Sequence, residues 1–161
     1  MCCRGVGSFG TAMEQIKRFE LDKVIREVVD HNKPFLGICL GLQLLFEGSD
    51  ESKGVEGLGL LKGTIKRIPD KEGFKIPHIG WNSLELMNDG RLFHDLPQQP
   101  YVYFVHSYYL TADDESIVKA RCKYNATIDA SVEQGNIFAC QFHPEKSSSI
   151  GLSILKNFAN I

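Results

Sequence analysis

The feature that most constrains this chain is a cysteine that lies between two glycines at the end of an apolar run. Residues 35–38 read Phe-Leu-Gly-Ile, which is typical of a short strand buried inside a parallel sheet. Cys39 follows directly, in Gly37-Ile38-Cys39-Leu40-Gly41. This is the G-x-S-x-G pattern of a sharp strand-to-helix turn, with cysteine in place of serine. Such a turn strains the backbone of its central residue, so the residues two before and two after it must be small. We therefore predict a buried strand, a tight turn at Cys39 and a helix over residues 40–46.

The pattern around this turn is that of an α/β sheet. Two helical stretches precede it, and we expect Thr11 and Asp22 to cap them. After a glycine-containing loop over residues 48–63, alternating and β-branched segments predict strands at 63–68, 81–86, 101–110, 116–123, 127–133 and 136–142, followed by a helix at 151–159. No repeat or linker interrupts the chain. We predict a single domain over residues 1–161, with helices on both faces of the sheet and a β-rich insertion.

Composition excludes several functional classes. The 161 residues include 18 basic and 20 acidic side chains, a net charge of −2, which marks no nucleic-acid surface. No apolar run approaches the ~20 residues of a membrane span, and no leader opens the chain, so we expect a cytoplasmic protein. The five cysteines are odd in number and show no C-x-x-C spacing. This argues against a disulfide framework and against a zinc site.

Cys39 is the candidate nucleophile. At the first turn of the predicted helix its thiol would feel the positive end of the helix dipole, which favours the thiolate. The backbone N–H of Leu40 would face the same site and could bind an oxyanion. The alternative is a buried, inert structural cysteine. The pentapeptide alone leaves both interpretations open.

His143 is the candidate base. Pro144 disfavours the helical conformation for His143 and favours an extended one. In an extended chain residues i and i+2 face the same way, so Glu145 should lie beside the imidazole. A carboxylate there would orient the ring through Nδ1 while Nε2 faces the thiol, as in activated nucleophiles. A lone His-Pro is more often a surface turn, but that reading loses weight once a cysteine turn of this kind exists elsewhere in the chain.

Together the two segments Gly37–Gly41, with Gln43, and Gln141–Glu145 resemble the signatures of the class I glutamine amidotransferases. The resemblance implies a flavodoxin-like sheet, no metal and no cofactor. Further segments are similar to one branch of that family, the glutaminase subunits of imidazole glycerol phosphate synthase from histidine biosynthesis. These are residues 42–46, 56–60, 77–82, 103–109 and 145–147. The resemblance runs from about Gly5 to the C-terminus.

The resemblance assigns roles to individual residues. Cys39 would attack the carboxamide of glutamine, His143 would pass a proton to the departing ammonia, and water would hydrolyse the thioester. Gln43 lies one helical turn after Cys39 and would reach the bound glutamine, whereas without the cysteine turn it would be an exposed helix residue. The backbone at Ser107 and Tyr108 would hold the substrate. The loop Gly5-Val6-Gly7 would supply a second oxyanion N–H beside that of Leu40, although a plain glycine turn fits the local sequence equally well.

The resemblance also implies a partner. The family docks on a (βα)8-barrel cyclase subunit as a heterodimer, and the ammonia crosses into it to form imidazole glycerol phosphate and AICAR. Trp81 and Lys146 match positions near that interface, but a lone tryptophan in a strand can equally be half-buried core. His78 is a core or interface residue with no catalytic role.

Three other functions stay open at this point. A paralogous amidotransferase could feed ammonia to another acceptor, for example in surface-sugar modification, with the same motifs. A degenerate, non-catalytic subunit could be kept for docking alone. A cysteine hydrolase acting on peptides shares the nucleophile logic, although no cleft for a peptide is indicated.

The N-terminus departs from the family pattern. The family has a strand–helix–strand segment before the glycine loop, and Met1-Cys2-Cys3-Arg4 cannot form it. We therefore expect an N-terminally incomplete fold, from a shortened chain rather than a minimal variant. We expect an exposed sheet edge, a loosely held Gly5–Gly7 loop, and a chain that is poorly soluble and nearly inactive on its own.

Overall fold

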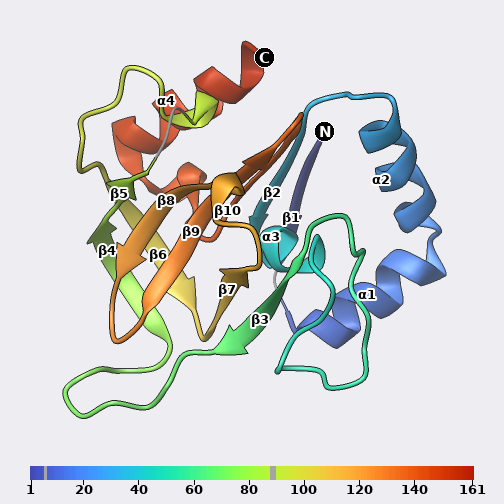
Figure 1. Ribbon diagram of the computed structural model, residues 1–161, viewed down its shortest axis with the longest axis horizontal. Helices are drawn as coiled ribbons and strands as arrows, with labels where there is room; N and C mark the ends of the chain where they lie inside the picture. Colours follow the sequence, from blue (N-terminus) through green and yellow to red (C-terminus); the bar gives the residue numbers. More distant parts are fainter. Residues whose placement is uncertain (6, 88–89) are drawn as a thin grey trace.

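The computed structural model describes residues 1–5, 7–87 and 90–161 (Figure 1). Its main sheet has six strands in the order β1-β2-β10-β9-β8-β5. The strands are β1 (Cys2–Gly5), β2 (Phe35–Cys39), β10 (Ile137–Cys140), β9 (Thr127–Gln134), β8 (Val118–Lys123) and β5 (Glu85–Leu86). The first three run parallel, and the other pairings are antiparallel. This mixed sheet confirms the predicted α/β class.

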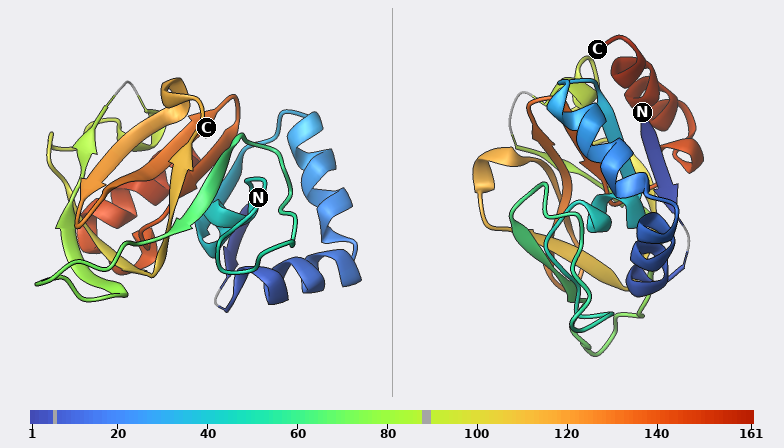
Figure 2. Two further views of the ribbon diagram at one scale, coloured as in Figure 1. Left: turned by 60° about the horizontal axis from the view of Figure 1, so that its bottom comes forward. Right: turned by 90° about the vertical axis from the view of Figure 1, so that its right-hand side faces the viewer.

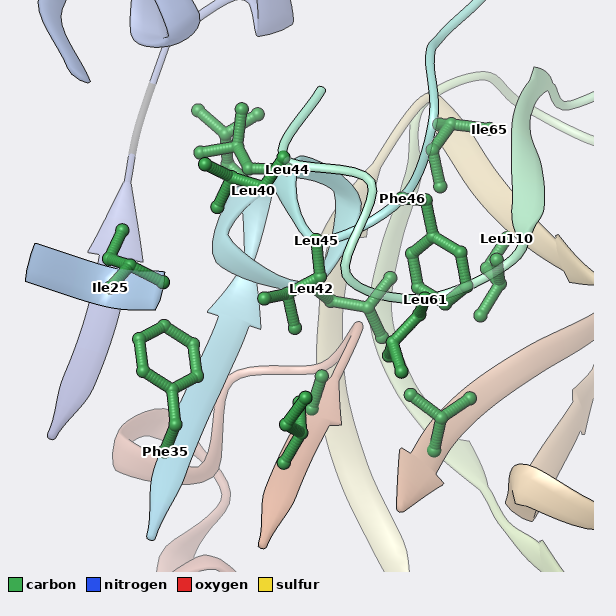
Figure 3. Close-up of a cluster of buried hydrophobic side chains, with 14 of the residues drawn as sticks. Ile25, Phe35, Leu40, Leu42, Leu44, Leu45, Phe46, Leu61, Ile65 and Leu110 are labelled. Atoms are coloured by element: carbon green, nitrogen blue, oxygen red, sulfur yellow. The ribbon is translucent and has the colours of Figure 1, made fainter. Parts of the chain in front are cut away.

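Alternating side chains of the central strands build two cores, one on each face of the sheet. Phe35 and Ala139 belong to one core, and Leu36 and Phe138 belong to the other. The helices α1 (Phe9–Arg18), α2 (Leu21–Asp30) and α3 (Leu40–Leu44) contribute to the first core, part of which Figure 3 shows. The C-terminal helix α4 (Ser148–Ala159) contributes to the second. Figures 1 and 2 show α1 and α2 at one side of the strands and α4 at the other, so helices cover both faces as predicted.

The helix starts differ from those expected. Ser8, not Thr11, caps α1, and its side chain accepts a hydrogen bond from the backbone N–H of Thr11. Asp22 lies inside the first turn of α2, which begins after Glu20 in a left-handed conformation. Ser8 is of a residue type that commonly caps helices, whereas Glu20 makes no side-chain cap hydrogen bond. The third helix, α3, ends at Leu44 rather than at the predicted residue 46.

Two further strand pairs lie outside the main sheet. The pair β3 (Gly63–Arg67) and β7 (Tyr108–Ala112) is antiparallel, as is the pair β4 (His78–Ser83) and β6 (Tyr101–His106). The predicted strand over 101–110 is therefore wrong as a single element, because it breaks at Ser107 into β6 and β7 with different partners. Likewise the predicted strand over 81–86 divides at Leu84 into β4 and β5. Short 3-10 turns occur at Arg91–Phe93, Glu115–Ile117 and Pro144–Lys146.

The first residues form more structure than their sequence indicates. Cys2–Gly5 pairs in parallel with β2, from Cys2 opposite Leu36 to Gly5 opposite Cys39. The nucleophile strand therefore has β1 on one edge and β10 on the other, and the exposed edge lies one strand further out than expected. Among the described residues no strand pairs with the outer edge of β1. No helix in the described part of the chain is long and apolar enough to cross a membrane.

A buried pair of histidines ties β4 and β6 to the rest of the fold. His78 and His106 are opposite each other in the register, with His78 Nδ1 3.1 Å from His106 Nε2. The His78 ring stacks on Tyr124 at a centroid distance of 4.0 Å. His106 Nδ1 lies 2.9 Å from the carbonyl oxygen of Tyr108, so Nδ1 carries the proton and donates it. Burial lowers the pKa of His106 to about 3 and that of His78 to about 4, so both rings are neutral near pH 7.

The turn at Cys39 gives a stability prediction. A Cβ on Gly41 would overlap the backbone carbonyl oxygen of Cys3 in β1, and neither backbone can move freely. We expect Gly41→Ala to lower the free energy of unfolding by about 1–3 kcal/mol, measured by urea denaturation. The control is Gly48→Ala, whose Cβ would meet only the Val55 carbonyl oxygen at 3.6 Å and should be neutral or stabilising by about 0.4–1 kcal/mol. Equal midpoints for the two variants would contradict the close approach.

The histidine pair predicts a pH dependence. Because folding lowers both pKa values, the unfolded chain binds more protons than the folded one below about pH 6.5. The stability is therefore complete above that pH and declines as the pH falls towards 4, by up to about 1.4 kcal/mol per pH unit for each histidine. Urea denaturation at pH 7, 6 and 5 should show this slope. His106→Gln should flatten it, whereas replacing the exposed His94 by Gln should not.

Candidate active site

The turn at Cys39 has the strained geometry that its glycines indicate. Cys39 ends β2 and precedes α3 with φ 54° and ψ −108°, a conformation that residues with side chains rarely adopt. A Cβ on Gly37 would lie 2.7 Å from the carbonyl oxygen of Gly41, and a Cβ on Gly41 would overlap Cys3. Both positions therefore require glycine. The strain is held by the packing of β1, β2 and α3 around it.

A cavity of about 340 Å³ opens beside Cys39. It gathers residues that are up to 139 positions apart in the sequence. Eight of the residues singled out in the sequence line it: Gly7, Cys39, Leu40, Gln43, Ser107, Tyr108, His143 and Lys146. Four others complete the wall, namely Glu51, Pro77, Val105 and His106. The cavity thus lies at the carboxyl end of β2, where α/β sheets commonly bind small ligands.

His143 is fixed on one side of this cavity. Its backbone is extended, with φ −103° and ψ 96°, and its side chain is buried. Its Nδ1 lies 2.8 Å from Oε1 of Glu145, as the spacing indicated, so Nδ1–H donates to the carboxylate and Nε2 keeps its lone pair. The backbone N–H of His143 donates to Tyr103, and its carbonyl accepts from the buried Ser147 hydroxyl at 2.6 Å. The same hydroxyl oxygen accepts from the Tyr103 N–H at 2.9 Å, which locks the loop onto β6.

Gln43 is buried at the cavity wall and is already engaged by the protein. Its Nε2 donates to the carbonyl oxygen of Tyr108 and to Oε1 of Gln141, both at 3.1 Å. An amide nitrogen has two hydrogens, so these two bonds use both. Only Oε1 of Gln43 is left for a molecule in the cavity. The residue lies where the sequence argument expected it, but its donors hold other protein groups.

Three of the singled-out residues lie outside the cavity wall, and a fourth is not among the described residues. Glu145 contacts the ring of His143. Gly5 ends β1 opposite Cys39, and Val6 lies outside the described residues. Trp81 on β4 is 53% exposed and belongs to neither of the two buried cores. Its ring meets that of Tyr103 edge-on at 6.1 Å, and the Lys146 ammonium lies 5.9 Å from the centroid of the same tyrosine.

The sequence argument assigned no role to three groups that line the cavity or contact Cys39. Gln141 is fully buried, and its Nε2 lies 3.6 Å from the Cys39 sulfur. It stands two residues before His143 in the same motif, which was the available signal. Glu51 lies in the loop after α3 and accepts the Phe9 N–H at 2.7 Å. His106 lies within an aromatic strand segment, and no pattern distinguishes it there from sheet packing.

The arrangement suits acyl transfer through a thiol. A sulfur nucleophile and an imidazole whose Nδ1 is bound to a carboxylate face one cavity, and the carboxylate orients the imidazole. The backbone N–H of Leu40, the residue after the nucleophile, is placed as an oxyanion donor by the same turn. In the described part of the chain no group of three or more His, Cys, Asp or Glu side chains is placed to hold a metal ion.

Comparison with known proteins places this geometry in a family. Residues 5–161 match the model of the family described as glutamine amidotransferase class-I. The chain is 48% identical over 157 residues to imidazole glycerol phosphate synthase subunit HisH of Thermosynechococcus vestitus, covering 96% of this chain and 74% of that protein. It is 45% identical over 157 residues to the subunit of the same name from Methanocaldococcus jannaschii, covering 98% and 78%. For that of Oceanobacillus iheyensis the identity is 49% over 154 residues, covering 96% and 76%.

Solved structures show the same fold at lower sequence identity. One described as a glutamine amidotransferase aligns with a TM-score of 0.68 at 20% identity, over 95% of this chain and 76% of that one. The structure of PurLQS from Thermotoga maritima aligns with a TM-score of 0.65 at 22% identity, over 87% and 67%. With the family match and the identities above, the chain belongs to the class I glutamine amidotransferases and, within them, to the HisH subunits of imidazole glycerol phosphate synthase.

Proposed function

We propose that this chain is a glutaminase that hydrolyses glutamine to glutamate and ammonia through a thioester on Cys39. The observation that carries the proposal is the shared cavity of Cys39 and His143, with Glu145 bound to the far nitrogen of the imidazole. A volume of about 340 Å³ suits a ligand of amino-acid size. The names of the relatives, subunits of imidazole glycerol phosphate synthase, support the same reading.

Charges at the cavity wall fit glutamine. The substrate carries an α-ammonium group, and the Glu51 carboxylate lines the cavity where it is fixed by the Phe9 N–H. Ser107 and Tyr108 also line the cavity, at the junction of β6 and β7, and would hold the α-carboxylate end through their backbone. Oε1 of Gln43 is an acceptor for an N–H of the substrate. Glutamine would thus lie with its side-chain amide towards Cys39.

The first half of the reaction forms the thioester. The Cys39 thiol gives its proton to Nε2 of His143 as the sulfur attacks the carboxamide carbon. The negative charge that develops on the substrate oxygen is stabilised by the backbone N–H of Leu40, with a second donor expected from the Gly5–Gly7 loop. When the tetrahedral intermediate collapses, the C–N bond breaks and the His143 proton goes to the leaving nitrogen. Ammonia departs, and the γ-glutamyl group stays on Cys39.

The second half consumes one water. Neutral His143 takes a proton from water through Nε2, and the oxygen attacks the thioester carbon. The C–S bond then breaks, and the sulfur regains the proton from His143. Glutamate leaves, and the enzyme returns to its first state. Glu145 keeps its contact with Nδ1 and stabilises the imidazolium that forms in each half.

The ammonia acceptor would be a partner subunit docked beside the cavity. On β4 and β6 the side chains of Ile79, Trp81 and Tyr101 are 53–59% exposed and share one face of the strand pair with Tyr103. Exposed apolar side chains gathered on one surface mark interaction sites. Lys146 links this face to the cavity, because it lines the cavity and lies over Tyr103. We propose that a (βα)8-barrel cyclase subunit covers this face, as a heterodimer, and receives the ammonia to form imidazole glycerol phosphate and AICAR.

Cys39 should be the site of covalent capture. A glutamine analogue with a chloroketone in place of the carboxamide should react once per chain, since the thiolate displaces chloride, and peptide mapping should find the label on Cys39. Cys2 is the internal control: it is exposed, so a small non-specific alkylator should label it while the analogue does not. Labelling that persists in Cys39→Ala would contradict the assignment of Cys39 as the nucleophile.

Turnover separates a glutaminase from a docking module. The assay follows glutamate release with the barrel subunit present, because that subunit is the proposed acceptor of the ammonia. Glu145→Gln should keep the fold and lower kcat by orders of magnitude, because the imidazole loses its orienting charge. Efficient partner binding without turnover would favour the non-catalytic alternative, and release of ammonia to another acceptor would favour a paralogue.

Lys146 should serve the partner surface. Lys146→Glu should weaken binding of the barrel subunit, and raising the salt concentration should reduce the difference from the unmodified chain. Lys33→Glu makes the same charge change in the exposed turn before β2, at the end of that strand away from Cys39, and should leave binding unchanged. If Lys146→Glu binds normally but releases ammonia more slowly, the residue belongs to the chemistry instead.

A further inference from the structure

A chain of side-chain amides reaches the Cys39 sulfur from inside the protein. The Nε2 atom of Gln141 lies 3.6 Å from Cys39 Sγ, and Oε1 of Gln141 lies 3.1 Å from Nε2 of Gln43. The same Gln43 nitrogen lies 3.1 Å from the carbonyl oxygen of Tyr108. Gln141 follows β10, Gln43 is on α3 and Tyr108 begins β7. Three separate elements therefore meet in this chain of contacts.

The backbone carbonyl of Tyr108 fixes the orientation of both amides. A carbonyl oxygen only accepts, so the Gln43 atom facing it must be the NH2 group. The second hydrogen of that group needs an acceptor, which places the oxygen of Gln141 towards Gln43. The NH2 group of Gln141 must then face the sulfur. Reversing either amide would bring two donors or two acceptors together.

The sulfur receives two opposing polar contacts. Gln141 donates to it, whereas the Cys39 thiol donates to the carbonyl oxygen of Val105 at 3.9 Å. The Val105 contact exists only while the thiol keeps its proton. The Gln141 contact grows stronger when the sulfur becomes negative, because hydrogen bonds to ions exceed those to neutral groups. Gln141 is fully buried and Gln43 is nearly so, so both amides are held within the protein rather than in solvent.

We propose that Gln141 is a further catalytic residue, whose side-chain N–H stabilises the Cys39 sulfur as an anion, and that Gln43 is the positioning residue that aims it. The proposal rests on the proposed function, in which the sulfur is anionic twice: just before it attacks the carboxamide, and as it leaves the thioester. At both points the charge sits on the atom that Gln141 contacts. Its donor is in place before the substrate arrives, so no reorganisation is needed.

The reactivity of Cys39 tests this without any turnover. The rate of alkylation by iodoacetamide, in which the sulfur displaces iodide, follows the thiolate fraction and is measured at Cys39 by peptide mass spectrometry from pH 5 to 10. The groups around Cys39 that titrate or carry charge come from several elements and are identical in all the variants compared: His143 with Glu145, Cys140, His106, Glu51 and Lys146. A difference between the pH profiles of two variants therefore reports the effect of the amide side chains alone.

Gln141→Met keeps the volume and removes the donor. The midpoint of the pH profile should move upward by about one unit, a tenfold loss of thiolate at a pH below both midpoints. Gln43→Met leaves Gln141 in place but frees it to rotate, and should move the midpoint in the same direction by less. In the glutaminase assay with the barrel subunit, Gln141→Met should lower kcat more than it raises KM.

The control is Ser131→Ala. Ser131 is a buried polar residue on β9, opposite Cys140 in the register, and its hydroxyl donates to the Ala139 carbonyl rather than to the site. If the midpoint depended only on packing in the sheet, Ser131→Ala and Gln141→Met would change it alike. We expect instead that the alkylation midpoint of Ser131→Ala matches that of the unmodified chain. If Gln141→Met does not fold, Gln43→Met decides the question by its midpoint alone.

Unchanged midpoints in both amide variants would overturn the role of Gln141, even if the chain is a glutaminase. Failure of the proposed function would give a different result from failure of the role of Gln141. A displaced midpoint in a chain that releases no glutamate with its partner would support the contact between Gln141 and the sulfur and refute the proposed function. Equal displacement in Ser131→Ala would show a packing effect and would also overturn the proposal.

Discussion

The close approach of Gly41 to the backbone of Cys3 is the contact on which the site depends. It brings the first turn of α3 against β1. The two backbones lie so close that a Cβ at position 41 would overlap the carbonyl oxygen of Cys3. With α3 seated there, the chain must leave β2 abruptly, and Cys39 takes its left-handed conformation. The thiol is therefore raised above the strand ends, where His143, Gln141 and the β6–β7 junction face it. Each of those groups is useful only because the turn is that tight.

The sequence indicated this part of the molecule well because its signals are local. The buried strand, the turn, the helix after it and the His143–Glu145 contact all lie within a few residues of the patterns that predict them. Where a long-range partner decides the bounds of a strand, the prediction failed. Residues 101–110 look like one strand, but β6 pairs with β4 while β7 pairs with β3, and the break at Ser107 follows from those partners. Met1–Arg4 shows no strand pattern, yet it pairs with β2 because the edge of that apolar strand accepts it.

The polar residues at the cavity show the same difference between local sequence signals and long-range contacts. Gln43 was identified by its distance of one helical turn from Cys39, which is local information. That its two donors are directed at Tyr108 and Gln141 depends on residues 65 and 98 positions away. Gln141 stands two residues before His143 in the same motif, but its contact with Cys39 spans 102 positions. Glu51 has no sequence neighbour that indicates a role. Gln141 is distinguished by its burial and Glu51 by its place in the cavity wall, and both are visible only in three dimensions.

The carbonyl oxygen of Tyr108 accepts hydrogen bonds from two directions, from Gln43 on the side of the sulfur and from His106 on the side of the histidine pair. Because this junction is a peptide group, no substitution at position 108 can delete it. A substitution of the side chain at position 108 would leave unchanged the orientations of the two amides, Gln43 and Gln141, and of the two imidazoles, His106 and His78. Only a displacement of the β7 backbone would disturb them, and it would disturb all four together. The polar order of the site is thus encoded in the path of the main chain and is shielded from most point mutations at that position.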